Sequence, residues 1–362
     1  MKKVPKQHQK KRQTNHGIVK LVLLELAHRA KMKFMENRDP HKLSVVIPLY
    51  RGEKTLRRIV EEITVFYEPT RTPENRMFQV VEVILVDDCS IDGTSEVMRS
   101  LSTDDNHIVP IWLTRNFGQH AATVAGMASS TSEWVVTMDE DGQHDPKDFG
   151  RLIDTAINAQ SPVVYARSVV REPHGIIRNT LSRFLKTFAL PILISDKNFR
   201  FFSSYRLMTG EVARSVSVFA NRGVYLDVLL LWISRSSAVC DVEYRNELEA
   251  ASGYNYRKLG SHFLRLALSS GTRPLRLVTI SGFLTFVSGL LGAVFVVQGK
   301  IAHGYDLKGW ASLTSIVLVL GGLVLLSLGI IAEYVGLLVR KALGAPLYVV
   351  GSNPLSGPLS RM

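Results

Sequence analysis

The chain has 362 residues, 46% of them hydrophobic, and a formal net charge of +12. Ten Lys and Arg residues lie between Met1 and Lys33 against a single acid, a charge block that suits an anionic membrane surface or a nucleic acid. No motif with interleaved aromatic residues accompanies this block, so nucleic acid is excluded as a partner and the lipid bilayer is favoured. The two cysteines, Cys89 and Cys240, lie far apart and lack metal-ligand spacing, which excludes a disulfide framework.

The first 42 residues are expected to form two segments. Residues 1–17 are polar and basic, and we predict that they are disordered. In residues 18–42, apolar side chains near one helical face with interspersed Lys and Arg predict an amphipathic helix on the membrane interface. An ordinary surface helix packed on the next domain is an equal alternative. The segment does not resemble a secretory signal, because Lys20 and Glu25 interrupt its apolar run.

Residues 43–240 alternate between short apolar runs rich in β-branched residues and helical segments. Strands are predicted at residues 43–48, 80–86, 108–113, 134–138 and 163–166, with helices at 54–66, 94–101 and 121–128. Thr94 is expected to cap the second of these helices. The alternation predicts an α/β fold in which helices cover both faces of a mostly parallel sheet. Such sheets bind ligands outside the carboxyl ends of their strands.

Two apolar segments follow a juxtamembrane stretch at 241–276. Residues 277–297 and 311–332 contain 21 and 22 residues without a charge. Each is long enough to span a hydrocarbon core of about 30 Å, so we predict two transmembrane helices. Cations are more frequent before the first span and after the second, which places the large domain, the 333–362 tail and both termini in the cytoplasm. Two buried helices of a soluble protein are the alternative.

The strand ending near Met138 leads into an acidic motif. Asp139, Asp141 and Gln143 alternate, so an extended backbone would direct all three to one side. Carboxylate and carbonyl oxygens are the ligands that Mg²⁺ or Mn²⁺ prefers, and such an ion could neutralise a diphosphate leaving group. An isolated motif of this kind is more often a solvated turn.

Neighbouring strand ends also carry polar residues that suit a nucleotide. Asp87 and Asp88 end the second strand, where a carboxylate could accept hydrogen bonds from a base or ribose. Pro48, Tyr50 and Glu53 follow the first strand, and the tyrosine ring could cover a base. Asp88 as a turn cap and Tyr50 as a packing residue are the alternatives. Several carboxylates at one edge repel one another, which a bound cation would offset.

Four motifs carry a resemblance to a known family: VVIPLY (45–50), VDDCSIDGT (86–94), RNFGQHAA (115–122) and DEDGQHDP (139–146). Together they resemble inverting glycosyltransferase family 2, and in particular its polyprenyl- and dolichyl-phosphate branch, which includes the undecaprenyl-phosphate 4-deoxy-4-formamido-L-arabinose transferases. The resemblance runs from about residue 43 to 350 and includes PLRL (274–277) and AEYVG (332–336). It implies a Rossmann-like, GT-A nucleotide-sugar domain. Arg51-Gly52 and Cys89 depart from the usual pattern.

The resemblance implies a role for each matching position. Nucleotide-sugar binding is assigned to Pro48, Tyr50, Glu53, Asp87, Asp88, Arg115, Asn116, Gly118, Gln119 and Asp139. The metal, Mg²⁺ or Mn²⁺, is assigned to Asp139, Asp141 and Gln143. The catalytic residues are Asp141 and Arg206, which lie near the donor diphosphate. The acceptor phosphate is assigned to Arg167, Arg178 and Ser182, of which the last two are also four residues apart and hence share a helical face.

The expected reaction moves a sugar from a nucleotide diphosphate to a polyprenyl phosphate at the cytoplasmic face of the inner membrane. A UDP-sugar and undecaprenyl phosphate are the favoured substrates, and the product would serve cell-envelope glycan assembly. A processive or glycolipid-forming synthase of the same family and a non-catalytic membrane scaffold are the alternatives. A Rossmann dehydrogenase is excluded because no GxGxxG follows the first strand. Enzymes of this kind can form tetramers, and the composition leaves a homo-oligomer open.

Overall fold

The structure is a computed structural model that describes residues 39–169, 202–220, 225–234, 236–245, 309–344 and 346–353, with scattered residues between 278 and 298. The predicted disordered tail and nearly all of the predicted interfacial helix lie outside the described residues. So do Arg178 and Ser182 and most of the juxtamembrane stretch.

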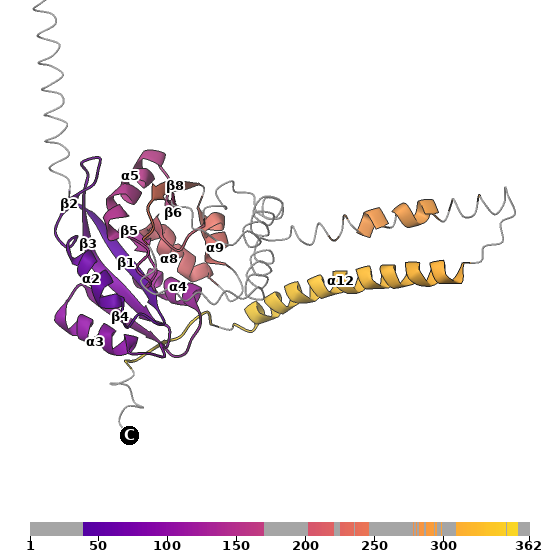
Figure 1. The fold of residues 1–362 in the computed structure, drawn as a ribbon, viewed down its shortest axis with the longest axis horizontal. Coiled ribbons are helices and arrows are strands. Elements are labelled where there is room, and N and C mark those ends of the chain that lie inside the picture. Colours follow the sequence, from indigo (N-terminus) through magenta and orange to yellow (C-terminus); the bar gives the residue numbers. More distant parts are fainter. Residues whose placement is uncertain are drawn as a thin grey trace, which may run out of the picture.

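A nine-stranded sheet organises the described part of the chain (Figure 1). Its order is β8-β6-β7-β5-β1-β3-β4-β9, with β2 paired to β3. The strands are β1 (His41–Leu49), β2 (Thr70–Arg71), β3 (Met77–Asp87), β4 (Ile108–Leu113), β5 (Trp134–Thr137), β6 (Val163–Ser168), β7 (Arg206–Thr209), β8 (Ser237–Val242) and β9 (Val350–Gly351). Among them β2, β7 and β9 pair antiparallel to their neighbours, so the sheet is mostly parallel as predicted.

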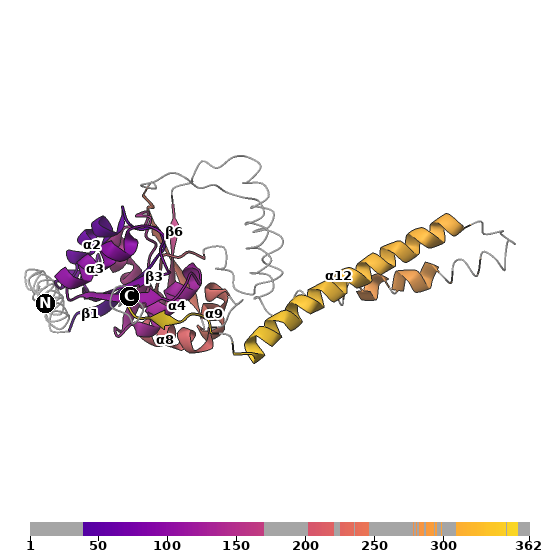
Figure 2. The same ribbon diagram turned by 90° about the horizontal axis from the view of Figure 1, so that it is seen from below.

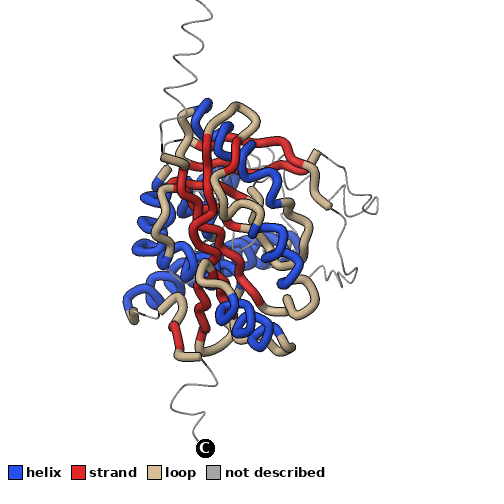
Figure 3. The backbone as a smooth tube through the Cα atoms, turned by 90° about the vertical axis from the view of Figure 1, so that its left-hand side faces the viewer, coloured by secondary structure: helices blue, strands red, loops and turns tan. Residues whose placement is uncertain are grey.

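Helices cover both faces of this sheet, which lies between them in Figure 3. The described helices are α2 (Leu56–Thr64), α3 (Thr94–Asp104), α4 (Gln119–Ser129), α5 (Phe149–Ala159), α8 (Gly210–Phe219), α9 (Leu226–Ile233) and α12 (Trp310–Ala342), with a short 3-10 turn, η1 (Pro146–Asp148). Apolar residues of α2, α3 and α5 join one core cluster, and those of α4, α8 and α9 join the other. Adjacent residues of β1 alternate between them: Val45 belongs to the first cluster and Val46 to the second.

Every predicted strand and helix of the domain is present, with ends shifted by three residues or fewer. The predicted cap is wrong. Gly93 occupies the cap position of α3 and Thr94 is its first helical residue. The Thr94 hydroxyl instead donates to Asp92 Oδ1 at 2.5 Å and accepts the Gly52 N–H at 2.8 Å, which ties the loop after β1 to α3.

One described helix is long and apolar enough to cross a membrane. It is α12, whose most apolar window is Val319–Gly336, and it contains the predicted second span. Figures 1 and 2 show it projecting away from the sheet. The predicted first span, residues 277–297, is described only in part, and within it lies a shorter apolar helix, Gly282–Gly292.

The chain returns to the sheet after α12. Val350 and Gly351 form β9, which pairs antiparallel with Leu113 and Trp112 of β4. The Thr114 N–H also donates to Val349 O at 3.0 Å. Leu347 and Tyr348 pack against the second core cluster. The segment that follows the apolar helix is therefore built into the sheet.

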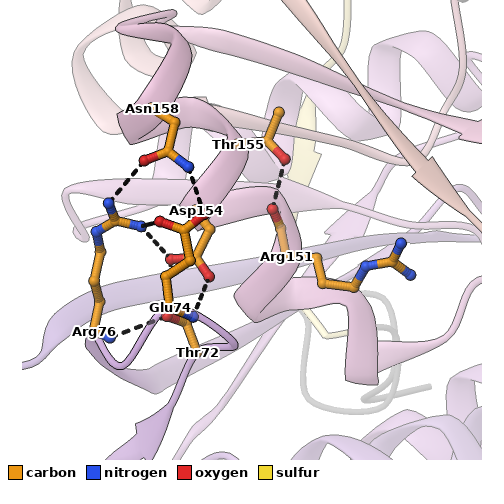
Figure 4. Close-up of polar contacts among 7 residues, drawn as sticks. All are labelled: Thr72, Glu74, Arg76, Arg151, Asp154, Thr155 and Asn158. Atoms are coloured by element: carbon orange, nitrogen blue, oxygen red, sulfur yellow. Dashed lines mark hydrogen bonds and ion pairs between the residues drawn. The ribbon is translucent and has the colours of Figure 1, made fainter.

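A compact polar network fastens the β2–β3 turn to α5 (Figure 4). Buried Asp154 accepts hydrogen bonds from Thr72 Oγ1 at 2.8 Å and the Glu74 N–H at 2.9 Å, and it pairs with Arg76 Nη1 at 2.5 Å. Asn158 bonds to both Arg76 and Glu74. None of these side chains lines the pocket described below, so the network serves the fold.

Replacing Asp154 with Ala should lower the free energy of unfolding by about 3 kcal/mol, because Arg76 and Thr72 lose their shared acceptor. Urea unfolding of the detergent-purified chain measures this. The control Glu74→Gln removes only a half-exposed carboxylate and should cost less than about 1 kcal/mol. Equal losses in the two variants would show that Asp154 is not the centre of the network.

Candidate active site

A cavity of about 350 Å³ opens at the carboxyl ends of β1, β3 and β5. It is lined by Pro48, Leu49, Tyr50, Asp88, Asn116, Gly118, Gln119, Asp139, Glu140 and Asp141. The predicted nucleotide-sugar and metal residues that it brings together are Pro48, Tyr50, Asp88, Asn116, Gly118, Gln119, Asp139 and Asp141. Parallel strands that end at one edge bring these loops together, as the alternating pattern predicts.

The acidic loop, residues 138–145, forms one wall of the cavity. The Asp139 carboxylate accepts hydrogen bonds from Gln119 Nε2 at 2.6 Å and Ser204 Oγ at 2.5 Å. Burial raises the pKa of Asp139, while these donors and the charge of Arg206 oppose the shift. At Gly142 the backbone turns with φ +77°, and the Gln143 N–H donates to Asp141 Oδ1 at 3.0 Å. The Asp141 carboxylate thereby faces the cavity from a fixed turn.

Buried His144 fixes the backbone at the start of this loop. Its Nδ1 accepts the Asp139 N–H at 3.0 Å, and its ring stacks on Tyr205 with centroids 4.7 Å apart. Burial lowers the pKa of His144 to about 4, which keeps the imidazole neutral and Nδ1 free to accept. Tyr205 in turn donates its hydroxyl to Asp145 O at 2.7 Å.

Glu140 joins the acidic loop to the loop after β1, residues 50–55. Its carboxylate accepts the N–H groups of Tyr50 at 2.8 Å and Arg51 at 3.0 Å. The Thr55 hydroxyl donates to Glu140 O at 2.5 Å. A Cβ at Gly52 would lie 2.8 Å from Glu140 Oε2, so a glycine is needed for this close approach. These bonds fix Tyr50 beside the cavity.

The two aspartates that end β3 act differently. Asp88 lines the cavity and accepts the N–H groups of Phe117 at 2.7 Å and Gly118 at 2.8 Å. It therefore shapes the loop that carries Asn116. Asp87 is buried and turns to its own loop, where it accepts from the Ser90 N–H at 2.8 Å and from the Ser95 hydroxyl. Asp87 is not among the lining residues.

Other predicted residues lie away from the cavity lining. Glu53 accepts the Gly93 N–H at 3.1 Å, at the start of α3. The Arg115 guanidinium lies 4.6 Å from the centre of the Phe117 ring. Exposed Arg167 forms two bonds with Asp241, at 2.5 and 2.6 Å.

Arg206, predicted to be catalytic, is buried within the sheet. It pairs with Asp227 of α9, and its Nε donates to Thr137 Oγ1 at 3.2 Å. The antiparallel β7 strand carries it into this position, opposite Thr137 of β5.

The acidic loop fits a divalent cation that is shared with a ligand. Among the described residues, no group of three or more His, Cys, Asp or Glu is placed to hold a metal. Asp139 and Asp141 nevertheless supply two carboxylates at one cavity wall. Mg²⁺ is usually bound by one or two carboxylates with phosphate and water oxygens completing its shell, so the donor set is sufficient.

Sequence reasoning missed Glu140, His144 and Ser204 as site-building residues. Glu140 and His144 lie within the DEDGQHDP motif (139–146), and their place in that motif is the signal that points to them. Ser204 reaches Asp139 from another strand connection. Nothing in the local sequence around Ser204 indicates that contact, because it depends on where β7 enters the sheet.

Residues 44–219 match the family model "Glycosyl transferase family 2". The chain therefore contains a glycosyl transferase family 2 domain with a GT-A, Rossmann-like α/β fold, and the protein is a glycosyltransferase. It is 28% identical over 314 residues to the bactoprenol glucosyl transferase of Shigella phage SfX, covering 86% of this chain and 99% of that one. It is also 28% identical over 323 residues to the undecaprenyl-phosphate 4-deoxy-4-formamido-L-arabinose transferase of Photorhabdus laumondii, covering 86% and 95%.

Solved structures are more distant. S. aureus TarS 1–349 in complex with UDP-GlcNAc has a TM-score of 0.44 and 16% identity, covering 63% of this chain and 66% of that one. The glucosyl-3-phosphoglycerate synthase of Mycobacterium tuberculosis in complex with Mn²⁺, UDP-glucose and phosphoglyceric acid has a TM-score of 0.43 and 17% identity, covering 64% and 79%.

The buried neutral His144 predicts a pH dependence. Unfolded histidine titrates near pH 6.5, so between about pH 6.5 and 4 the unfolded chain binds more protons than the folded one. The free energy of unfolding should therefore fall as the pH falls, by about 2 kcal/mol between pH 7.5 and 5 from this residue. His144→Phe keeps an aromatic ring but cannot titrate, and should show a shallower slope in urea unfolding. Parallel slopes would contradict the assignment.

Proposed function

We propose that this glycosyltransferase moves a sugar from a nucleotide diphosphate to a polyprenyl phosphate, with inversion at the anomeric carbon. The observation that carries the proposal is that one cavity is lined both by Tyr50 and by the loop that bears Asp139 and Asp141. The names of the two relatives supply the acceptor class, bactoprenol or undecaprenyl phosphate. A UDP-sugar is the favoured donor.

The donor would lie along the cavity with its base beside Pro48 and Tyr50. Asn116, Gly118 and Gln119 would contact the sugar-diphosphate side, and Asp88 keeps their loop in place through two N–H bonds. Asp139 and Asp141, with Gln143, would hold Mg²⁺ or Mn²⁺ together with the diphosphate. The ion would supply positive charge where the leaving diphosphate gains negative charge.

The acceptor is already an anion, so its phosphate oxygen needs no general base. That oxygen would form the new bond to the anomeric carbon while the bond to the donor's β-phosphate oxygen breaks, releasing a nucleoside diphosphate. Arg167, Arg178 and Ser182 are the proposed acceptor-phosphate ligands. Arg206 would act on the donor side through its charge, which already lowers the pKa of Asp139 against the effect of burial. Positioning and electrostatics then account for catalysis.

The proposed topology has two spans with both ends of the catalytic domain on one side. β8 and β9 belong to one sheet, yet α12 lies between them in the chain. If α12 crosses the bilayer, the chain between β8 and α12 must cross it an odd number of times, because β9 returns to the same sheet. The apolar residues 277–297 are the candidate for that crossing. The surplus of cations at the flanks of the two apolar segments supports a cytoplasmic location for the sheet.

Asp141→Asn should abolish transfer, by at least about 100-fold, while leaving the fold intact, because the amide cannot replace a charged metal ligand. The assay incubates detergent-purified protein with Mn²⁺ or Mg²⁺, undecaprenyl phosphate and a panel of UDP- and GDP-sugars, and detects the lipid product by mass spectrometry. EDTA should remove the product. Asp104→Asn, on the exposed side of α3, is the control. Retained turnover in Asp141→Asn would refute the metal role; nucleotide binding by the wild type without any product would favour a scaffold.

The topology predicts opposite accessibility for two engineered thiols. In a chain with Cys89 and Cys240 replaced by Ser, a membrane-impermeant maleimide should label Gly304→Cys in whole cells. It should label Ser352→Cys, next to β9, only after permeabilisation. Labelling of both positions from the same side would rule out the two-span arrangement.

A further inference from the structure

Two residues that follow β8 contact the acidic loop from the side at which the chain leaves the domain. Tyr244 and Arg245, here called the latch, come directly after β8 and Glu243. Residue 246 begins the stretch that connects the sheet to residues 277–297. The latch is thus the last described point of the catalytic domain before the chain leads to the proposed first span.

Arg245 bonds to the acidic loop through its backbone and its side chain. Its N–H donates to Gln143 O at 2.9 Å. Its guanidinium contacts Asp145 Oδ2 through Nη2 at 2.7 Å and Nε at 3.1 Å, and it contacts Glu62 Oε2 of α2 through Nη1 at 2.5 Å. The side chain is only 27% exposed, so these ion pairs are partly shielded from water. Arg245 therefore ties the far end of the acidic loop to α2.

Tyr244 bonds to Ser203, which precedes Ser204 in the loop before β7. Its hydroxyl lies 2.6 Å from Ser203 Oγ and donates to Ala166 O at 3.3 Å. Its ring meets His144 edge-on at 5.0 Å. Ser204 donates to Asp139 Oδ2, and His144 accepts the Asp139 N–H. Tyr244 therefore reaches both residues that orient Asp139 from outside the cavity lining. It contacts His144 directly, and it bonds to Ser203, the neighbour of Ser204.

We propose that the latch positions the metal site, because the contacts of Tyr244 and Arg245 set the geometry of the acidic loop. Arg245 is a positioning residue: it acts through Asp145 and Gln143 on a loop whose other end carries Asp139. The inference rests on the proposed function, since it concerns the metal that the acidic loop would hold. It goes further because it assigns a role in metal affinity to Tyr244 and Arg245, which lie outside all of the family motifs given above.

Arg76 offers a matched comparison. It too is partly buried, with 20% of its side chain exposed, and it pairs with two carboxylates, Asp154 and Glu74. Its network lies on the β2–β3 turn and α5, apart from the cavity lining (Figure 4). Losing Arg76 should therefore cost stability in a similar way without acting on the metal site.

The test measures Mn²⁺ binding to the full detergent-purified chain by the electron paramagnetic resonance signal of free Mn²⁺, with UDP or GDP present. Arg245→Met should weaken Mn²⁺ binding about 10-fold. Arg245→Lys should recover part of the lost Mn²⁺ affinity, because a single ammonium group cannot bond to Asp145 and Glu62 as fully as the guanidinium does. Arg76→Met should stay within about twofold of the wild type even though its melting temperature falls. At saturating Mn²⁺, the kcat of Arg245→Met should recover toward the wild-type value.

The outcomes separate this inference from the proposed function. A wild-type chain that binds Mn²⁺ and nucleotide normally, together with an Arg245→Met variant that binds Mn²⁺ equally well, would overturn the latch alone. An equal weakening in Arg245→Met and Arg76→Met would also overturn it, since the effect would then be general destabilisation. A wild-type chain that binds neither Mn²⁺ nor nucleotide would overturn the proposed function and the latch with it.

Discussion

Carboxylates buried at the edge of the sheet must be given hydrogen-bond donors, and the loops around the cavity are arranged to provide them. Burial raises the pKa of Asp88 and of Glu140, and backbone N–H groups from the next loop partly oppose that shift. Asp88 thereby fixes the loop at Phe117 and Gly118, and Glu140 fixes the loop at Tyr50. Burying either carboxylate without donors would cost free energy, and the hydrogen bonds that remove this cost also connect two loops. The shape of the cavity follows from this requirement.

The same requirement explains why Asp139 is held from several directions. Its carboxylate meets Gln119 and Ser204, while its N–H meets a histidine that burial keeps neutral. A protonated imidazole would lose the acceptor at Nδ1. Asp139 is thus fixed in direction before any cation binds, and such preorganisation is what electrostatic catalysis needs.

A second constraint comes from the return of the chain to the sheet. β9 pairs with β4 beyond α12, next to the loop that carries Arg115 and Asn116. Tyr244 and Arg245 contact the acidic loop at the other point where the chain leaves the domain. Both connections between the catalytic domain and the apolar segments therefore end beside the cavity.

The order of strands and helices, the position of the acidic motif and the presence of a long apolar helix could all be predicted from the sequence. These depend on local periodicity and on residue types at strand ends, such as the buried run of β3 and the turn at Gly142. The strand ends and the four motifs that resemble family 2 together predicted most of the residues that line the cavity. Three features are visible only in the folded chain: Asp87 faces its own turn, Arg206 is buried against Asp227, and Tyr244 and Arg245 contact the acidic loop. The contacts of Arg206, Tyr244 and Arg245 join residues far apart in the chain, and they depend on the antiparallel entry of β7 and the placement of β8, which no local pattern encodes.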